Sequence, residues 1–325
     1  AVEAADQINE IASQLQALRA NQEKYNSHEQ LFEFEPEKSR LLSKLVDDFT
    51  PIHGLWNLAR EWTTTYDQWM MTPFPQLKAD QMSQFITTSS KTLIKLKKSL
   101  SGQRAMIEKV VVPLITQVDQ FKQKMILLTK LKHPGIKTQH WEQISQIVGF
   151  SVMPSSDVTL QEFLGFDLDR WSDKISEIAG VAMQEYTIES TLDQMDVDLQ
   201  TIKFITVTYK GSGHFILQKV DDIVSTMDDQ IVTTQSLLTS PYISPVRQRA
   251  TEKLDFLKLS HVKLDLWIIC QRNFLYLLPI FSGTTIQKKL LKEASDWTAV
   301  NKTWRSIMTV THNYTEFLNV MHREQ

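Results

Sequence analysis

The sequence predicts a mainly α-helical protein, an elongated array of helical bundles with one small β-hairpin near residues 202–217. Glycine is scarce, with nine among 325 residues, whereas a sheet-rich protein of this length needs more glycine in its turns. Apolar residues recur at helical spacing over long stretches, and a single segment alternates as strands do. Because 42% of the residues are hydrophobic, the chain can bury a sizeable core.

The helical pattern is clearest in two stretches. Near the N-terminus, Ile8, Ile11, Leu15 and Leu18 lie three or four residues apart and predict one helical stripe. A longer, heptad-like seam typical of coiled coils follows, and Pro113 inside it should kink or start the helix. The seam consists of Ile107, Val111, Leu114, Val118, Phe121, Met125 and Leu128.

Breaks in the helical pattern divide the chain into expected parts. His133-Pro134-Gly135 should end the seam helix, and proline- or glycine-containing breaks recur at 73–75, 149–156, 240–245 and 281–285. We therefore expect an N-terminal bundle region at 1–132, a middle helical part with the hairpin at 133–240, and a C-terminal helical part at 241–325. No regular internal repeat is visible.

The hairpin is predicted from strand-like alternation. Ile205, Val207 and Tyr209 alternate with threonines, and a Lys-Gly-Ser-Gly loop separates them from a second β-branched and aromatic run. Because an isolated hairpin is marginal in water, it must pack against helices.

Composition excludes several classes of function. A net charge of −3 and a pI of about 6.3 argue against nucleic-acid binding, and without an uncharged apolar run of 18 residues no membrane span is expected. The N-terminus has no signal-peptide pattern and no initiator Met, so we expect an excised piece or processed product. The single cysteine, Cys270, excludes an internal disulfide and is expected to be buried and inert, in a reducing cytoplasmic compartment.

No motif predicts catalysis, a metal or a cofactor. Gly211-Ser-Gly213 lacks the lysine and spacing of a phosphate-binding loop, and the eight histidines are scattered. Neighbouring carboxylates such as Asp196 and Asp198 point apart on a helix, so solvated faces or helix starts are expected. A basic cluster could meet an acidic surface, although the solvated face of an amphipathic helix is the simpler interpretation. The cluster consists of Lys91, Lys95, Lys97, Lys98 and Arg104.

The run from Trp267 to Phe281 resembles a signature of the dynein heavy-chain linker, W…Q…W-x-Y-L…I-F, with Phe274 in place of the second Trp. Other segments in the same order are similar to this family, including Glu29 to Phe32 with Pro36, His140-Trp141, and Ser240-Pro241-Tyr242. The resemblance continues through Ile286 and covers roughly 29–308. Its expected structural signature is Trp141, Trp267, Gln271, Tyr276, Ile280, Phe281 and Trp304.

The resemblance implies a mechanical function. It implies a lever that bends and straightens over an ATPase ring to drive microtubule-based movement, truncated here before the first ATPase module. The implied partners are the chain's own ring modules, the dynein tail and other dynein chains, with microtubules contacted only indirectly. ATP and Mg²⁺ would belong to the ring, and no cofactor is expected in this segment. A cytoplasmic or an axonemal cytoskeletal location is implied, and the alternative function is a helical tether or scaffold without a motor.

Two segments are candidates for motion and contact. The break at Ser240, Pro241, Tyr242, Ser244 and Pro245 is a candidate hinge, with an ordinary rigid turn as the alternative. The hairpin tip is a candidate contact with the ring, because hairpins offer exposed edges. The residues of the tip are Lys210, Gly211, Ser212, Gly213 and His214.

Overall fold

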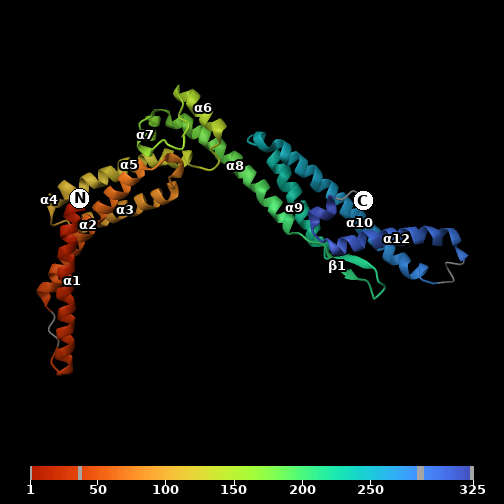
Figure 1. The fold of residues 1–325 in the computed structure, drawn as a ribbon, viewed down its shortest axis with the longest axis horizontal. Helices are drawn as coiled ribbons and strands as arrows, with labels where there is room; N and C mark the ends of the chain where they lie inside the picture. The colour runs from red at the N-terminus through yellow and green to blue at the C-terminus, as the bar shows by residue number, and fades with distance from the viewer. Residues whose placement is uncertain (1, 36–38, 284–288, 323–325) are drawn as a thin grey trace. The chain divides into compact units, whose positions relative to one another are not determined.

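The computed structural model describes residues 2–35, 39–283 and 289–322, and most of them form α-helices (Figure 1). The predicted fold class is confirmed: within the described residues, the sheet consists of a single two-stranded antiparallel hairpin. Pro36 and Ile286, which contribute to the family resemblance, lie outside the described residues.

The chain divides into two compact units, Ala1–Ala182 and Met183–Gln325. The division falls inside the middle part expected at 133–240, within a helix that continues from Ser172 to Thr201. No break in the sequence pattern marks this position, since the helix is unbroken there. The expected three-part division stays a prediction.

The regular elements of unit 1 in its described residues are all helices, besides one isolated β-bridge between Pro73 and Thr159. Its helices pack as α1 on α2 and as α3 on both α2 and α5. Its elements are α1 (Val2–Leu31), α2 (Arg40–Met71), η1 (Phe74–Gln76), α3 (Ala79–Ser99), α4 (Arg104–Met106), η2 (Ile107–Val111), α5 (Val112–Leu131), α6 (Thr138–Val148), α7 (Leu160–Leu164), η3 (Leu168–Trp171) and the first part of α8 (Ser172–Thr201).

The predicted heptad-like seam lies in η2 and α5, and all its members are buried except the half-buried Ile107. Pro113 occupies the first turn of α5, directly after the π-helical turn η2. Proline has no N–H to donate, and the first turn of a helix needs no such donor. The preceding π-helical turn is wider than an α-helical turn and accommodates the proline ring. The helix ends at Leu131, before His133-Pro134-Gly135, as predicted.

Aromatic rings dominate the core of unit 1. Trp62 of α2 stacks on Phe85 of α3 with ring centroids 6.0 Å apart, and Trp69 stacks on Phe121 of α5 at 5.7 Å. The signature residue Trp141 of α6 packs edge-on against Phe74 at 6.1 Å. Such pairs add about 0.5–1.5 kcal/mol each beyond the burial of their area.

Unit 2 contains the hairpin and the longest helix. Its α9 and α10 pack against each other, while α12 packs against the hairpin. Its elements are the remainder of α8, β1 (Ile205–Thr208), β2 (Phe215–Gln218), α9 (Val220–Leu238), η4 (Ser244–Val246), α10 (Arg247–Phe281), α12 (Leu291–Asn313) and α13 (Phe317–Met321).

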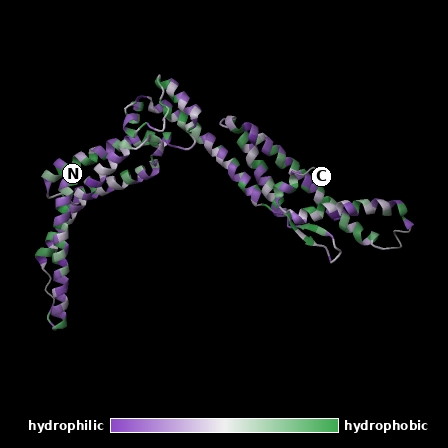
Figure 2. Cartoon of the chain, viewed as in Figure 1, coloured by the Kyte–Doolittle hydropathy of each residue, from purple (hydrophilic) through white to green (hydrophobic). Residues whose placement is uncertain are grey.

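Hydrophilic and hydrophobic residues interleave along the helices (Figure 2), as expected for helices that bury one face. On α3 the lysines of the basic cluster are exposed while Leu93 is fully buried, so this helix has the solvated face that was expected. The prediction for Cys270 was wrong, because the structure places it on the exposed face of α10. The prediction was based on the apolar neighbours of Cys270 in sequence. In a helix each residue is rotated by about 100° from the one before it, so adjacent residues occupy different faces.

Candidate functional site

The β-hairpin and the helices that hold it form the candidate site. β1 pairs with β2 in antiparallel register, with Ile205 opposite Gln218 and Thr208 opposite Phe215. The tip turns through Gly211 and Gly213, which have φ of 70° and 74°, values that favour glycine. The sequence prediction of a hairpin here is confirmed.

Gln271 of α10 closes the outer edge of β2. Its side-chain Oε1 accepts a hydrogen bond from Leu217 N at 2.7 Å, and its Nε2 donates to Leu217 O at 3.0 Å. The carboxamide therefore replaces a third strand at this point, and both backbone groups of the buried Leu217 are satisfied. An edge that would otherwise be left open is joined to a long helix.

Trp304 of α12 makes the second edge contact. Its indole Nε1 donates to Phe215 O at 3.2 Å, while its ring stacks on Phe274 of α10 at 4.8 Å between centroids. Phe274 also stacks on Trp297 at 5.1 Å, and Trp297 stacks on Phe281 at 5.3 Å. This ladder of four rings fixes α12 against α10 beneath the hairpin.

Other residues hold the remaining parts of the hairpin. His312 stacks on Phe215 at 4.0 Å and lies 2.8 Å from the hydroxyl of Thr206. On the other side of β1, Phe204 N donates to Thr315 O at 2.7 Å, and Phe317 N donates to Ile202 O at 3.0 Å. Sequence reasoning missed these partners. They lie about a hundred residues from the hairpin, and no local pattern marks them.

The predicted contact residues at the tip have different environments. Lys210, Gly211, Ser212 and Gly213 are exposed, whereas His214 is buried. The Nε2 atom of His214 lies 2.8 Å from Asn301 Oδ1 and 3.1 Å from Arg305 Nε, which donates to it. Thus four of the five residues are available for contact, and His214 instead anchors the tip to α12.

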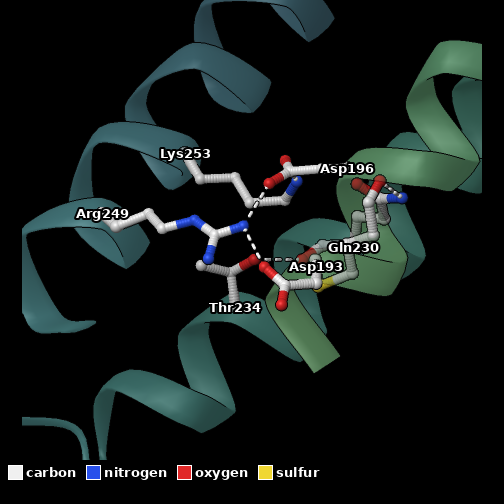
Figure 3. A network of polar contacts seen from close by, with 7 residues as sticks. Asp193, Asp196, Gln230, Thr234, Arg249 and Lys253 are labelled. Carbon is white, nitrogen blue, oxygen red and sulfur yellow. Dashed lines mark hydrogen bonds and ion pairs between the residues drawn. The ribbon is translucent and has the colours of Figure 1, made fainter. Parts of the chain in front are cut away.

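A polar network joins α8, α9 and α10 in unit 2 (Figure 3). The Arg249 guanidinium contacts Asp193 Oδ1 at 2.7 Å and Asp196 Oδ2 at 2.5 Å, and Lys253 Nζ contacts Asp196 Oδ1 at 2.5 Å. The Gln230 amide of α9 donates to the Met195 carbonyl at 3.1 Å. Asp196 is thus not merely on a solvated face, as expected from sequence, but bridges two cations of α10.

The charges of this network shift the ionisation of its members. Partial burial raises the pKa of Asp196, but the hydrogen bonds from Lys253 and Arg249 outweigh it and leave that pKa lowered. The pKa of Arg249 is raised by its hydrogen bonds to Asp196 and Asp193. Only 6% of the Lys253 side chain is exposed, so this cation depends on its carboxylate partner.

The candidate hinge is the turn between α9 and α10. Ser240, Pro241, Tyr242, Ser244 and Pro245 surround Ile243, which is fully buried in a small cluster with residues of α8 and α10. Since α9 and α10 also pack together, bending at this turn would expose Ile243. The packing favours the alternative of a rigid turn, and the location of a hinge stays a prediction. The other members of the cluster are Ile188, Leu192, Met195 and Ala250.

The described residues contain no group of three or more His, Cys, Asp or Glu side chains placed to hold a metal ion. A cavity of about 360 Å³ in unit 1 is lined by Trp62, Tyr66, Phe121 and their neighbours. Burial raises the pKa of Tyr66, with the Asp67 charge adding to the effect. The lining contains neither a histidine nor a cysteine, so it offers no activated nucleophile of those types.

One described helix, the stretch Ser244–Phe281 that contains α10, is long and apolar enough to cross a membrane by length and composition. This is weak evidence, because helices packed inside a protein meet the same criterion. Here Leu257, Leu264 and Trp267 of α10 are buried in the core of unit 2.

The chain is mainly helical, and its hairpin is held by Gln271 and Trp304, two residues of the expected signature. These features agree with one family. Residues 42–325 match the family described as "Dynein heavy chain, N-terminal region 2". The chain belongs to this dynein heavy-chain family. Gln271 and Trp304, which the resemblance singled out, both lie within the matched residues and contact the hairpin directly.

Curated relatives of this dynein heavy-chain segment include axonemal proteins. It is 31% identical over 318 residues to "Dynein axonemal heavy chain 1" of Homo sapiens, covering 98% of this chain and 7% of that protein. It is 32% identical over 307 residues to "Dynein axonemal heavy chain 3" of Homo sapiens, covering 94% of this chain and 7% of the relative. The chain therefore spans less than a tenth of these relatives.

Proposed function

We propose that this chain is part of a dynein linker, a lever that bends and straightens over an ATPase ring. The observation that supports the proposal most directly is the double clamp on β2. Gln271 and Trp304 join its outer edge to α10 and α12. Because close-packed interiors deform little, a hairpin held in this way transmits a contact at its tip to two helices.

The proposal assigns the chemistry to other parts of the heavy chain. ATP and Mg²⁺ would act in ring modules, while this chain contacts the ring and changes its position over it. The proposed partners are those modules, the dynein tail and other dynein chains, with microtubules contacted indirectly. The axonemal names of the relatives support a location in the axonemal cytoskeleton.

The lever function is testable in a complete heavy chain by fluorescence energy transfer. A donor is attached at Ser225, an exposed position of α9, through a label that does not react with the exposed Cys270, and an acceptor is attached to the ring. We expect the transfer efficiency to differ between the nucleotide-free and the ADP-vanadate states, because a lever changes its distance to the ring. Equal efficiencies in a motor with normal ATPase activity would contradict the proposal and favour a tether.

A second measurement tests the proposal that ATP binds to the ring modules of the heavy chain and not to this chain. Calorimetric titration of the 325-residue chain with MgATP should give no binding heat, because the sequence contains no phosphate-binding loop. Saturable binding at micromolar MgATP would contradict it.

A further inference from the structure

An exposed apolar stripe runs along α10. Its positions step by three and four residues, which places them on one face of the helix. The exposed fractions of its apolar members range from 37% at Ile280 to 73% at Tyr276. The stripe consists of Leu259, Val262, Leu266, Ile269, Asn273, Tyr276 and Ile280.

The stripe is separate from the face of α10 that builds unit 2. Leu257, Leu264, Trp267, Phe274 and Leu278 are buried on that other face. A helix that is apolar on two opposite faces is normally covered on both. On α9, in contrast, the exposed face that contains Asp222, Ser225 and Asp229 is mainly polar, although Val232 on the same face is exposed as well.

The spacing indicates what kind of element covers the stripe. Alternating steps of three and four over three heptads are the pattern by which two helices pack side by side. Asn273 replaces an apolar residue at one position, and a polar residue there is a device that sets the register of paired helices. A single long helix, rather than a loop or a small ligand, matches this surface.

We propose that the stripe on α10 is the docking surface for an amphipathic helix of the same heavy chain, from sequence outside residues 1–325. Relatives of this chain offer ample sequence for it, since the matched segment is 7% of their length. The exposed charges Lys258, Asp265 and Arg272 border the stripe at seven-residue spacing, so the docked helix carries acidic residues opposite the two cations and a basic residue opposite Asp265.

A lipid surface is the less suitable occupant. Asp265 and Arg272 flank the stripe, and Asp265 pairs with His261 at 3.2 Å. Charged groups at this depth would lie in the hydrocarbon, which costs several kcal/mol per group. The proposal rests on membership of the dynein heavy-chain family and does not depend on the power stroke.

Cys270 supplies the test, because it is exposed beside Ile269 and is the only cysteine of this chain. Its rate of alkylation by a maleimide is measured in the 325-residue chain and in the complete heavy chain, with the modified peptide quantified by mass spectrometry. Docking should slow the reaction in the complete heavy chain by at least about tenfold, because modification then requires local opening.

Two variants make the result specific. Leu266→Glu places a charge in the centre of the stripe and should restore fast alkylation of Cys270 in the complete heavy chain. Because Leu266 is exposed, the melting curve of the 325-residue chain should be unchanged. The control Ser225→Cys at an exposed position of α9 should react at the same rate in both proteins.

Three results would overturn the proposal. Equal alkylation of Cys270 in both proteins would show that no helix covers the stripe. Protection in the 325-residue chain that grows with concentration, with a dimer in sedimentation, would assign the stripe to a second copy. Protection only by anionic or neutral lipid vesicles would assign it to a membrane. None of these results depends on gliding or energy transfer, so they are distinguishable from failure of the lever proposal.

Discussion

Trp267 and Trp304, two tryptophans of the expected signature, differ in what their rings contribute. Trp304 packs and also donates a hydrogen bond to the hairpin. Trp267 is 9% exposed, and its indole nitrogen has no hydrogen-bond partner in the described residues. Its ring lies 5.7 Å from that of Phe204, so its contribution is apolar packing in the core of unit 2.

Trp267→Ala should therefore destabilise unit 2 strongly. Removing a buried aromatic side chain costs about 3–5 kcal/mol, from lost burial and from the cavity left behind. Thermal or urea unfolding of the 325-residue chain measures the change. Tyr276→Ala on the same helix is the matched control, because Tyr276 is 73% exposed and exposed substitutions usually change stability by less than about 0.5 kcal/mol. Similar losses for both variants would contradict a packing role for Trp267.

Asp196→Asn should destabilise unit 2 at neutral pH and much less in acid. The variant deprives the buried Lys253 of its charged partner, and an unsatisfied buried donor costs on the order of 1–3 kcal/mol. The folded-state pKa of Asp196 lies below its ordinary value of 3.8, so its contribution is complete above that pH. The contribution is lost as pH falls through the lowered pKa, where the wild type becomes neutral as well.

The measurement is urea unfolding of both proteins between pH 7 and pH 2. The difference in unfolding free energy should stay constant down to about pH 4 and then shrink. Asp229→Asn, at an exposed position of α9, controls for the general effect of removing a carboxylate. If the difference in unfolding free energy between wild type and Asp196→Asn grew in acid, the stabilising role of the ionised Asp196 in the network would be contradicted.

At the scale of elements, sequence reasoning predicted what local chemistry determines. The end of α5 follows from proline and glycine after Leu131, and the hairpin follows from alternating β-branched residues. The support of the hairpin could not be predicted, because Gln271 meets Leu217 across 54 positions of sequence. The family resemblance singled out Gln271, but only the structure shows its bidentate contact. Cys270 was predicted to be buried but is exposed, since apolar neighbours in sequence do not determine which face of a helix a residue occupies.

Gln271→Met should loosen the outer edge of β2 while leaving the helices folded. Methionine has similar length but cannot replace either hydrogen bond, so Leu217 N–H loses its partner in a buried position. If the free energy of local opening falls by about 1.4 kcal/mol, hydrogen exchange at the Leu217 amide becomes roughly tenfold faster. Hydrogen exchange followed by NMR or mass spectrometry measures it.

Arg272→Met serves as the control for this substitution, because the neighbouring side chain is exposed. It should leave exchange at Leu217 unchanged. Equal exchange rates in wild type and Gln271→Met would show that the hairpin holds its edge without the clamp.

At the scale of the whole molecule, the proposed lever must be stiff within its bundles. The turn between α9 and α10 lies inside such a packed region. Ile243 is fully buried against residues of α8 and α10. Flexing there would separate packed helices and expose this side chain, at about 1.5–3 kcal/mol for the side chain alone. We therefore expect motion to occur elsewhere than at residues 240–245.

A gliding assay with complete heavy chains tests this expectation. The double variant Pro241→Gly, Pro245→Gly loosens the backbone of the turn but keeps Ile243. Because the buried side chain holds the turn, microtubule gliding should keep its speed. Ile243→Ala, which removes that anchor at a cost of about 2–5 kcal/mol, should slow gliding while ATPase activity is retained. Slowed gliding by the double proline variant, again with normal ATPase activity, would contradict the rigid turn and restore the hinge at Ser240 to Pro245. Uncoupling of movement from hydrolysis is the decisive sign, because a defect confined to the proposed lever leaves the chemistry of the ring intact.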